Sequence, residues 1–310
     1  QALYRGHDVK EISRSDAGAY NLSLTTKALN RIIEQSKQHH EKSICFVTGV
    51  PGAGKTLVGL NIANERHQYD EQEHAVFLSG NGPLVAVLRE ALARDEIKRF
   101  KGKITKTASK RKVAAFIQNI HHFRDAYLPP SEQVPAEKVA IFDEAQRAWT
   151  KEQTAKFMLK RHVPGWNMSE PEFLISVMDR HQDWTVIICL IGGGQEIHTG
   201  EAGLLAWFDA LRDHFPDWNV YVSPQISDVE YTHGKPLEHL FTGLRLYREP
   251  NLHLSVSLRS FRNERVSAFV KSLLDENLPV AQQLYSELSP NYPITITRSL
   301  EKAQEWIRAQ

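Results

Sequence analysis

The 310-residue sequence has few cysteines, no long apolar run and almost no net charge. Its two cysteines, Cys45 and Cys189, lie within the apolar stretches ICFV and IICLI, so we expect buried thiols and no disulfide framework. No apolar run reaches the ~18 residues of a membrane-spanning helix, and no signal peptide opens the chain. A net charge of +1 excludes a polybasic character for the whole chain, so any nucleic-acid surface must be a local patch.

The remaining composition is ordinary for a soluble protein, with 41% hydrophobic and 24% charged residues. The length allows two domains, or one large domain with insertions. Few cysteines and no leader lead us to expect a cytoplasmic protein without membrane contact. Because the sequence begins with Gln1 and not with Met, we expect it to be a piece of a longer protein or a trimmed one.

Short apolar runs alternate with helical patterns along most of the chain. Such runs predict buried strands at 43–49, 75–80, 139–144, 185–193 and 218–223. Helices are expected before, between and after these strands. The alternation predicts an α/β fold with a parallel sheet and helices on both faces.

The segment 49–56 reads GVPGAGKT, a full match to the phosphate-loop pattern G-x-x-x-x-G-K-[ST]. Glycines let backbone N–H groups wrap a β-phosphate without side-chain interference. Lys55 can reach the β- and γ-phosphates, and the Thr56 hydroxyl can hold magnesium. An apolar strand before the loop and a helix after it make a chance match improbable, so the sequence predicts a site for ATP and Mg²⁺.

The segment 139–146 reads VAIFDEAQ, in which an apolar strand delivers two carboxylates at its C-terminal end. Ligands of open parallel sheets bind at that edge. Asp143 is predicted to hold magnesium, directly or through water, and Glu144 to act as general base for the attacking water.

Two further polar groups follow later strands. Gln195 follows a glycine-rich strand end and is a candidate contact of the γ-phosphate or the attacking water, with Glu196 as a weaker candidate. Arg259 and Arg262, in SLRSFR, are candidates for stabilising transition-state charge. The alternatives are an incidental glutamine in a turn and surface arginines at a helix start.

Together, the stretches GVPGAGKT, FLSGNGPL, IFDEAQRAW, LIGGGQEIHTGEAGL and LHLSVSLRSFR resemble superfamily 1 DNA/RNA helicases, and more narrowly the Schlafen-type helicase-like domains, over roughly residues 40–275. The resemblance implies a RecA-like fold. It also implies that Gln195 and Arg259 act in hydrolysis with Lys55 and Glu144, and that 77–84 touches the nucleic-acid backbone. The nucleotide-binding residues that we expect are Gly49, Pro51, Gly52, Ala53, Gly54, Lys55, Thr56, Leu57 and Gln146.

Two departures from the family pattern bear on mechanism. Glycine replaces the acid that usually precedes the glutamine of the third motif, which changes the expected geometry around Gln195. The chain also ends before the last helicase motifs, which lie on a second RecA-like domain. We therefore expect a lead-in with a helix at 1–40, a RecA-like ATPase domain at 41–226, and at 227–310 a connecting segment with the start of a truncated second domain. The rest of the parent chain is an expected partner.

A basic run at 94–112 contains nine Lys or Arg among nineteen residues and two acids. Such a strip could follow a single-stranded phosphate backbone without reading sequence, or it could be a solvated loop. Phe123 could stack on a base but is more typical of a core residue, and Trp149 is likewise more typical of packing.

The sequence thus favours a nucleic-acid-dependent ATPase, a helicase-type enzyme that acts on single-stranded DNA or RNA. One alternative is an ATP-binding switch or scaffold with slow hydrolysis, consistent with the glycine in the third motif. Another is a small-molecule kinase, which the Asp143–Glu144 pair disfavours because a base that activates water would waste ATP.

Overall fold

The computed structural model describes residues 16–69, 74–100, 104–192, 203–227, 241–256, 263–289, 293–295 and 297–309. The contacts within the chain divide it into two compact units, Gln1–Leu258 and Arg259–Gln310, which are described separately below. None of the helices in the described ranges is long and apolar enough to cross a membrane.

A parallel sheet forms the centre of the first unit, with the strand order β3-β2-β4-β5-β1-β6-β7, and β8 pairs with β1 off this path. All of these pairings are parallel. The predicted α/β, RecA-like sheet is confirmed. The strands are β1 (Lys42–Gly49), β2 (His74–Ser79), β3 (Ile117–Asn119), β4 (Glu137–Asp143), β5 (Thr185–Leu190), β6 (Asn219–Val222), β7 (Arg245–Arg248) and β8 (His253–Leu254).

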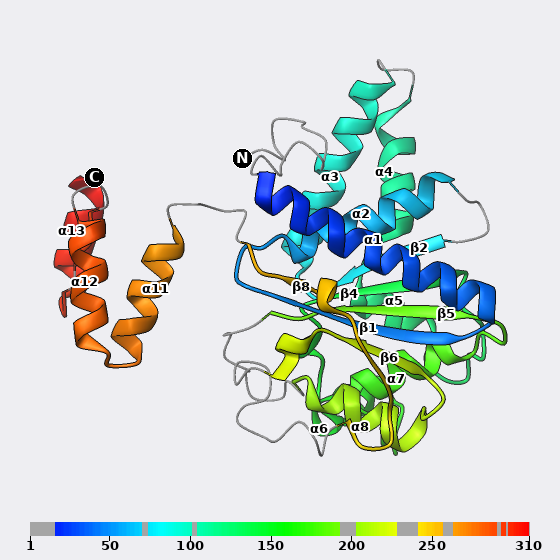
Figure 1. The fold of residues 1–310 in the computed structure, drawn as a ribbon. Coiled ribbons are helices and arrows are strands. Elements are labelled where there is room, and N and C mark those ends of the chain that lie inside the picture. Colours follow the sequence, from blue (N-terminus) through cyan, green and yellow to red (C-terminus); the bar gives the residue numbers. More distant parts are fainter. Residues whose placement is uncertain are drawn as a thin grey trace. The chain divides into compact units, whose positions relative to one another are not determined.

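Helices cover both faces of this sheet, as the ribbon in Figure 1 shows. Its α-helices are α1 (Asp16–His39), α2 (Lys55–Tyr69), α3 (Gly82–Arg99), α4 (Lys106–Phe116), α5 (Ile120–Ala126), α6 (Lys151–Lys160), α7 (Glu170–Asp179) and α8 (Leu205–His214). Short 3₁₀ turns are η3 (Ala145–Arg147), η4 (Pro224–Ser227) and η5 (Pro250–Leu252).

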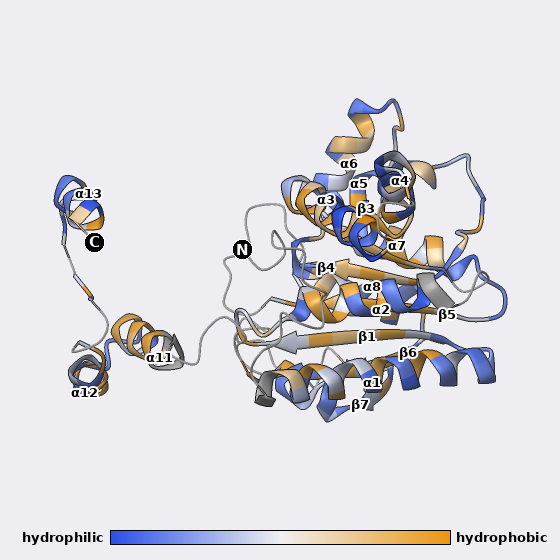
Figure 2. Ribbon diagram, turned by 90° about the horizontal axis from the view of Figure 1, so that it is seen from above, coloured by the Kyte–Doolittle hydropathy of each residue, from blue (hydrophilic) through white to orange (hydrophobic). Residues whose placement is uncertain are grey.

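Two hydrophobic cores form because successive side chains of a strand point to opposite faces. Along β1, Cys45 and Val47 join the core beneath α1 and α2, whereas Ile44 and Phe46 join the core beneath α7 and α8. The strands carry mostly hydrophobic colour in Figure 2, and α1 carries both hydrophobic and hydrophilic positions. Cys45 and Cys189 are both buried, as predicted, and burial raises the pKa of each thiol.

The structure contains two strands that the sequence patterns did not predict. β3 interrupts the stretch 113–123, whose pattern predicts mostly helix, and β7 lies in a polar region. β7 pairs with β6 and β8 pairs with β1, so the sheet continues to residue 254, beyond the expected limit at 226. Helix α1, expected as a lead-in, is part of the first core through residues such as Leu29 and Ile33.

The second unit contains the helices α11 (Asn263–Leu274), α12 (Leu278–Leu288) and α13 (Leu300–Ala309). Phe269, Ala281 and Leu288 form a small core between α11 and α12. The run ITIT at 294–297 is a strand candidate by sequence, but the residues of that segment that the structure describes are not in a strand. The expectation that this region begins a second RecA-like domain stays a prediction.

Candidate functional site

The predicted phosphate loop joins the C-terminal end of β1 to the N-terminus of α2. Gly52 and Gly54 have φ values of 77° and 93°, which glycine adopts without steric cost. The Ala53 N–H donates to the Val50 carbonyl at 3.1 Å and closes a tight turn. The loop thus has the open backbone and the helix N-terminus that an anion needs.

The Lys55 side chain folds back over this loop. Its Nζ donates to the Gly49 carbonyl at 2.6 Å and to the Val50 carbonyl at 3.3 Å. These bonds keep the ammonium group at the mouth of the loop. A phosphate there would compete with the two carbonyls for the same ammonium.

Thr56 at the start of α2 and Asp143 at the end of β4 are in contact, although β5 lies between β1 and β4 in the sheet. The Thr56 Oγ1 hydroxyl donates to Asp143 Oδ1 at 3.2 Å. Burial raises the pKa of the Asp143 carboxyl to about 7, and the nearby Glu144 charge adds to this shift, while Thr56 and Lys55 oppose it. A buried carboxylate with a raised pKa gains most from a nearby cation.

These two oxygens suit magnesium, which prefers hard oxygen ligands and is often held by one or two protein groups plus substrate phosphates. No cluster of three or more His, Cys, Asp or Glu side chains that could hold a metal occurs in the described ranges. The donor set therefore fits a metal shared with phosphates and not a metal enclosed by the protein. The assignment of Thr56 and Asp143 as metal ligands stays a prediction.

Glu144 directly follows β4 and has a left-handed backbone, with φ 53° and ψ 46°. This conformation is uncommon for a residue with a side chain and is concentrated at functional sites. Its Oε2 accepts a hydrogen bond from Gln146 Nε2 at 2.5 Å and lies 4.0 Å from Arg147 Nε. Each of the two adjacent carboxylates has its own polar partner, Thr56 for Asp143 and Gln146 for Glu144.

Gln146 links this turn to the end of β5. Its Oε1 accepts from the Gly192 N–H at 3.0 Å, and its side chain is almost fully buried. The Ala145 carbonyl accepts from Trp207 Nε1 at 2.9 Å, which fixes the same turn to α8. Gln146 therefore connects the acidic pair with the strand that leads to the predicted third motif.

Four predicted residues have no described placement. Gln195 and Glu196 lie in 193–202, and Arg259 and Arg262 lie in 257–262, both outside the described residues. The structure does describe the chain just before each segment: Gly192 contacts Gln146, and β8 pairs with the end of β1. Their roles stay predictions.

The sequence patterns missed the role of β8 at the phosphate loop. The Leu254 carbonyl accepts from the Val50 N–H at 3.0 Å. A Cβ on Gly49 would come within 2.7 Å of the Leu254 backbone oxygen, so only glycine allows this approach. The run LHLSVSL at 252–258 indicates a strand, but no local pattern indicates which strand it pairs with.

The residues that were candidates for nucleic-acid contact differ in their exposure. Asn81, in the 77–84 stretch, is exposed and caps α3 by accepting from the Leu84 N–H at 3.1 Å. Phe123 is only 2% exposed, so it is a core residue and not a stacking platform. Trp149 packs against His121, Phe157 and the buried Arg124, which confirms the packing interpretation.

In the described part of the basic run at 94–112, several cations pair with acids on α3. Glu90 pairs with Lys106 at 3.1 Å and with Lys110 at 2.7 Å. Lys112 pairs with Glu96 at 2.8 Å. Hydrogen bonds from Lys110, Arg94 and Lys106 lower the pKa of Glu90 to about 2. The run is therefore a helical hairpin with internal ion pairs, and its DNA or RNA contacts stay a prediction.

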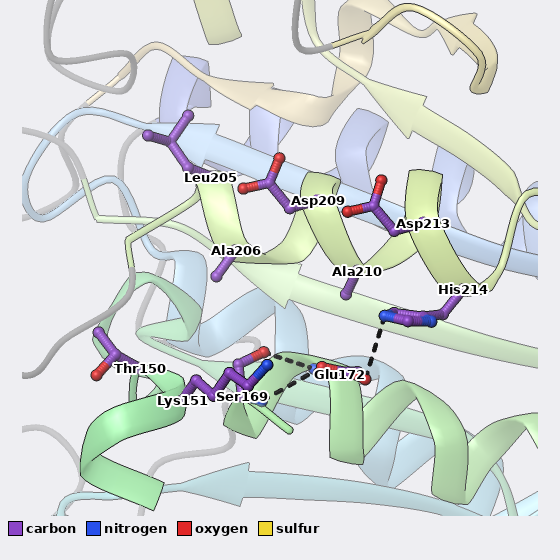
Figure 3. A pocket seen from close by; sticks show the side chains of 10 residues that line it. All are labelled: Thr150, Lys151, Ser169, Glu172, Leu205, Ala206, Asp209, Ala210, Asp213 and His214. Carbon is purple, nitrogen blue, oxygen red and sulfur yellow. Dashed lines mark hydrogen bonds and ion pairs between the residues drawn. The ribbon is translucent and has the colours of Figure 1, made fainter. Parts of the chain in front are cut away.

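A cavity of about 330 Å³ lies apart from this site, between α6, α7 and α8. Figure 3 shows Glu172 and His214 facing each other across it, with Ala206 and Ala210 along one wall. His214 Nε2 lies 3.4 Å from Glu172 Oε1, and the two side chains form an ion pair when the imidazole is protonated. None of the predicted site residues lines this cavity.

Comparison with known proteins gives one family match. The family model described as Schlafen group 3, DNA/RNA helicase domain, matches residues 42–310. No curated protein matches the chain. The crystal structure of the Pyrococcus furiosus Hef helicase domain aligns with a TM-score of 0.34 and 13% identity, over 65% of this chain and 39% of that chain. At this level of similarity the solved structure carries no argument about function.

Proposed function

The chain belongs to the Schlafen group 3 DNA/RNA helicase domain family, and from that premise we propose that it is a superfamily 1 type ATPase. It would hydrolyse ATP with magnesium and couple hydrolysis to movement on, or remodelling of, single-stranded DNA or RNA. The observation that carries this proposal is the contact between Thr56 Oγ1 and Asp143 Oδ1. It joins the start of the phosphate-loop helix to the end of a strand two positions away in the sheet.

The residues support a division of labour in the hydrolysis step. Backbone N–H groups of the loop, such as those of Gly52 and Gly54, would bind the β-phosphate, and Lys55 would exchange the carbonyls of Gly49 and Val50 for phosphate oxygens. Thr56 and Asp143 would hold the metal. When bound, magnesium would neutralise charge on the β- and γ-phosphate oxygens.

Glu144 would take the proton of the attacking water. A base must lie beside that water and be ionised at neutral pH. The hydrogen bond from Gln146 holds one carboxylate oxygen and leaves the other for water. Gln195 and Arg259 remain our candidates for contacts to the γ-phosphate.

A second candidate function is an ATP-binding switch with slow hydrolysis. The glycine that replaces the usual acid of the third motif favours it, as does the hydrogen bond from Gln146 that occupies one oxygen of the Glu144 carboxylate. The small-molecule kinase remains the weakest alternative, since Glu144 beside Asp143 suits activation of water.

Steady-state ATPase measurements with and without single-stranded DNA or RNA separate these functions. We expect magnesium-dependent ATP hydrolysis that either nucleic acid stimulates severalfold. Tight ATP binding with slow, unstimulated hydrolysis would favour the switch. Phosphate transfer to an added small molecule, without release of free phosphate, would indicate the kinase.

A further inference from the structure

Helix α1 lies outside the region that the family model matches, which begins at residue 42. It is nevertheless bonded to the segment that leads into β8. The buried Thr25 hydroxyl donates to the Asn251 carbonyl at 2.7 Å, and Arg31 pairs with Glu249. Figure 1 shows α1 running along the sheet close to β8. A part of the chain without a family motif thus contacts the strand next to the phosphate loop.

The Asn21 amide supplies the outer partner of β8. Its Nδ2 donates to the His253 carbonyl at 3.3 Å, and its Oδ1 accepts from the Ser255 N–H at 2.9 Å. In a strand, residues two apart direct their backbone polar groups to the same side. One side chain therefore satisfies the free edge of β8 as a neighbouring strand would.

The opposite edge of β8 holds the phosphate loop. The Leu254 carbonyl accepts from the Val50 N–H at 3.0 Å. The Leu254 Cβ lies 2.7 Å from where a Gly49 Cβ would be, so the two backbones are in close contact. β8 is only two residues long, so its few ladder bonds act together with the burial of Leu254 and a 2.9 Å hydrogen bond between the Thr48 hydroxyl and the His253 ring.

We propose that Asn21 is a positioning residue of the nucleotide site, which acts by holding β8 against the first residues of the phosphate loop. The inference rests on the proposed function, because the loop must bind nucleotide for its position to matter. Asn21 touches no reacting group. Its loss would let β8 move away and would release the Val50 N–H from its acceptor.

The test compares Asn21→Ala with a control in the same helix, Asn30→Ala. Asn30 Nδ2 donates a hydrogen bond to Glu65 Oε2 on α2 at 3.2 Å. The control therefore also removes a hydrogen bond made by a side-chain amide of α1, but one that does not involve β8. Hydrogen exchange of the peptide 48–53 is measured without nucleotide, together with the Kd of ATP and the ATPase kcat and KM. We expect Asn21→Ala to speed exchange and to weaken ATP binding by about fivefold to tenfold, the scale of one or two hydrogen bonds.

Asn21→Asp gives a second, milder variant, because it keeps the acceptor for Ser255 but loses the donor to His253. We expect an intermediate effect on exchange and on Kd. A loss of thermal stability shared equally by Asn21→Ala and Asn30→Ala, with unchanged exchange at 48–53, would overturn the proposal.

A parallel measurement on Lys55→Ala separates this inference from the proposed function. If the wild-type chain binds no more ATP than Lys55→Ala, the proposed function fails, and with it a role for Asn21 in nucleotide binding. If the wild-type chain binds ATP and Asn21→Ala matches Asn30→Ala in exchange and Kd, only the inference about Asn21 fails.

Discussion

The sequence indicates two candidate phosphate-binding elements, the phosphate loop and the basic hairpin of α3 and α4. In the loop, backbone geometry prepares the site, with Gly52 and Gly54 at positive φ and Lys55 held at the mouth. In the hairpin, Lys106 and Lys110 are paired with Glu90. A motif that specifies backbone shape predicts where groups lie, whereas a run of charges predicts composition only, since long side chains find nearby acids.

The largest effect should come from Lys55→Ala, which removes the ammonium group from the loop. We expect ATP binding to weaken about tenfold or more and hydrolysis to fall below detection, because the change removes the ammonium group that lies on the carbonyls of Gly49 and Val50. Lys156→Ala, an exposed lysine on α6, is the matched control. ATP turnover at the wild-type rate in Lys55→Ala would show that the loop is not the phosphate-binding element.

Glu144→Gln should separate binding from hydrolysis. The change is nearly isosteric and removes the base, so we expect ATP binding within about threefold of wild type and turnover lower by about 10²–10⁴-fold. Binding by fluorescence and single-turnover hydrolysis measure the two quantities. A variant that loses ATP binding would assign Glu144 to metal binding or to the turn with Gln146.

The sheet could be predicted because five of its strands are continuous apolar runs, such as those ending at Gly49 and Asp143. β7 could not, because its residues are mostly exposed and two of its four are arginines. The run 252–258 indicates a strand at β8, but nothing in it indicates the pairing with β1. The predicted pair of Thr56 and Asp143 is brought together. The Asn21 contact joins residues 232 positions apart, and no local pattern encodes it.

Asp143 should make the nucleotide-free protein less stable at higher pH. Its folded pKa, about 7, lies above the ordinary value of 3.8. The stabilisation that comes from protonating Asp143 in the folded state is therefore full below about pH 4 and is lost as pH rises through 7. We expect Asp143→Asn to raise Tm by several degrees at pH 8 and by less than about one degree at pH 4.

Thermal unfolding of both proteins across this pH range, without nucleotide or metal, measures the difference. Thr56→Val, which removes only the hydroxyl bonded to Asp143, serves as the matched control and should not reproduce the pH dependence in the same direction. An equal Tm difference at pH 4 and pH 8 would show that the Asp143 carboxyl titrates normally.

The smallest effect should come from the basic hairpin, and it sharpens the comparison most directly. Lys106, Lys110, Arg111 and Lys112 are changed together to Gln, and single-strand affinity is measured against salt. Four phosphate contacts would flatten the log–log slope by about 2.8, at about 0.7 each. The three lysines are paired with Glu90 or Glu96, whereas Arg111 has no ion pair in the described part of the chain, so we expect a change in slope near 0.7.

The converse variant, Glu90→Gln, releases Lys106 and Lys110 and should tighten single-strand binding about twofold at low salt. A slope change near 2.8 would mean that the lysines leave their acids for phosphates, and the hairpin would then be as much a phosphate-binding element as the loop.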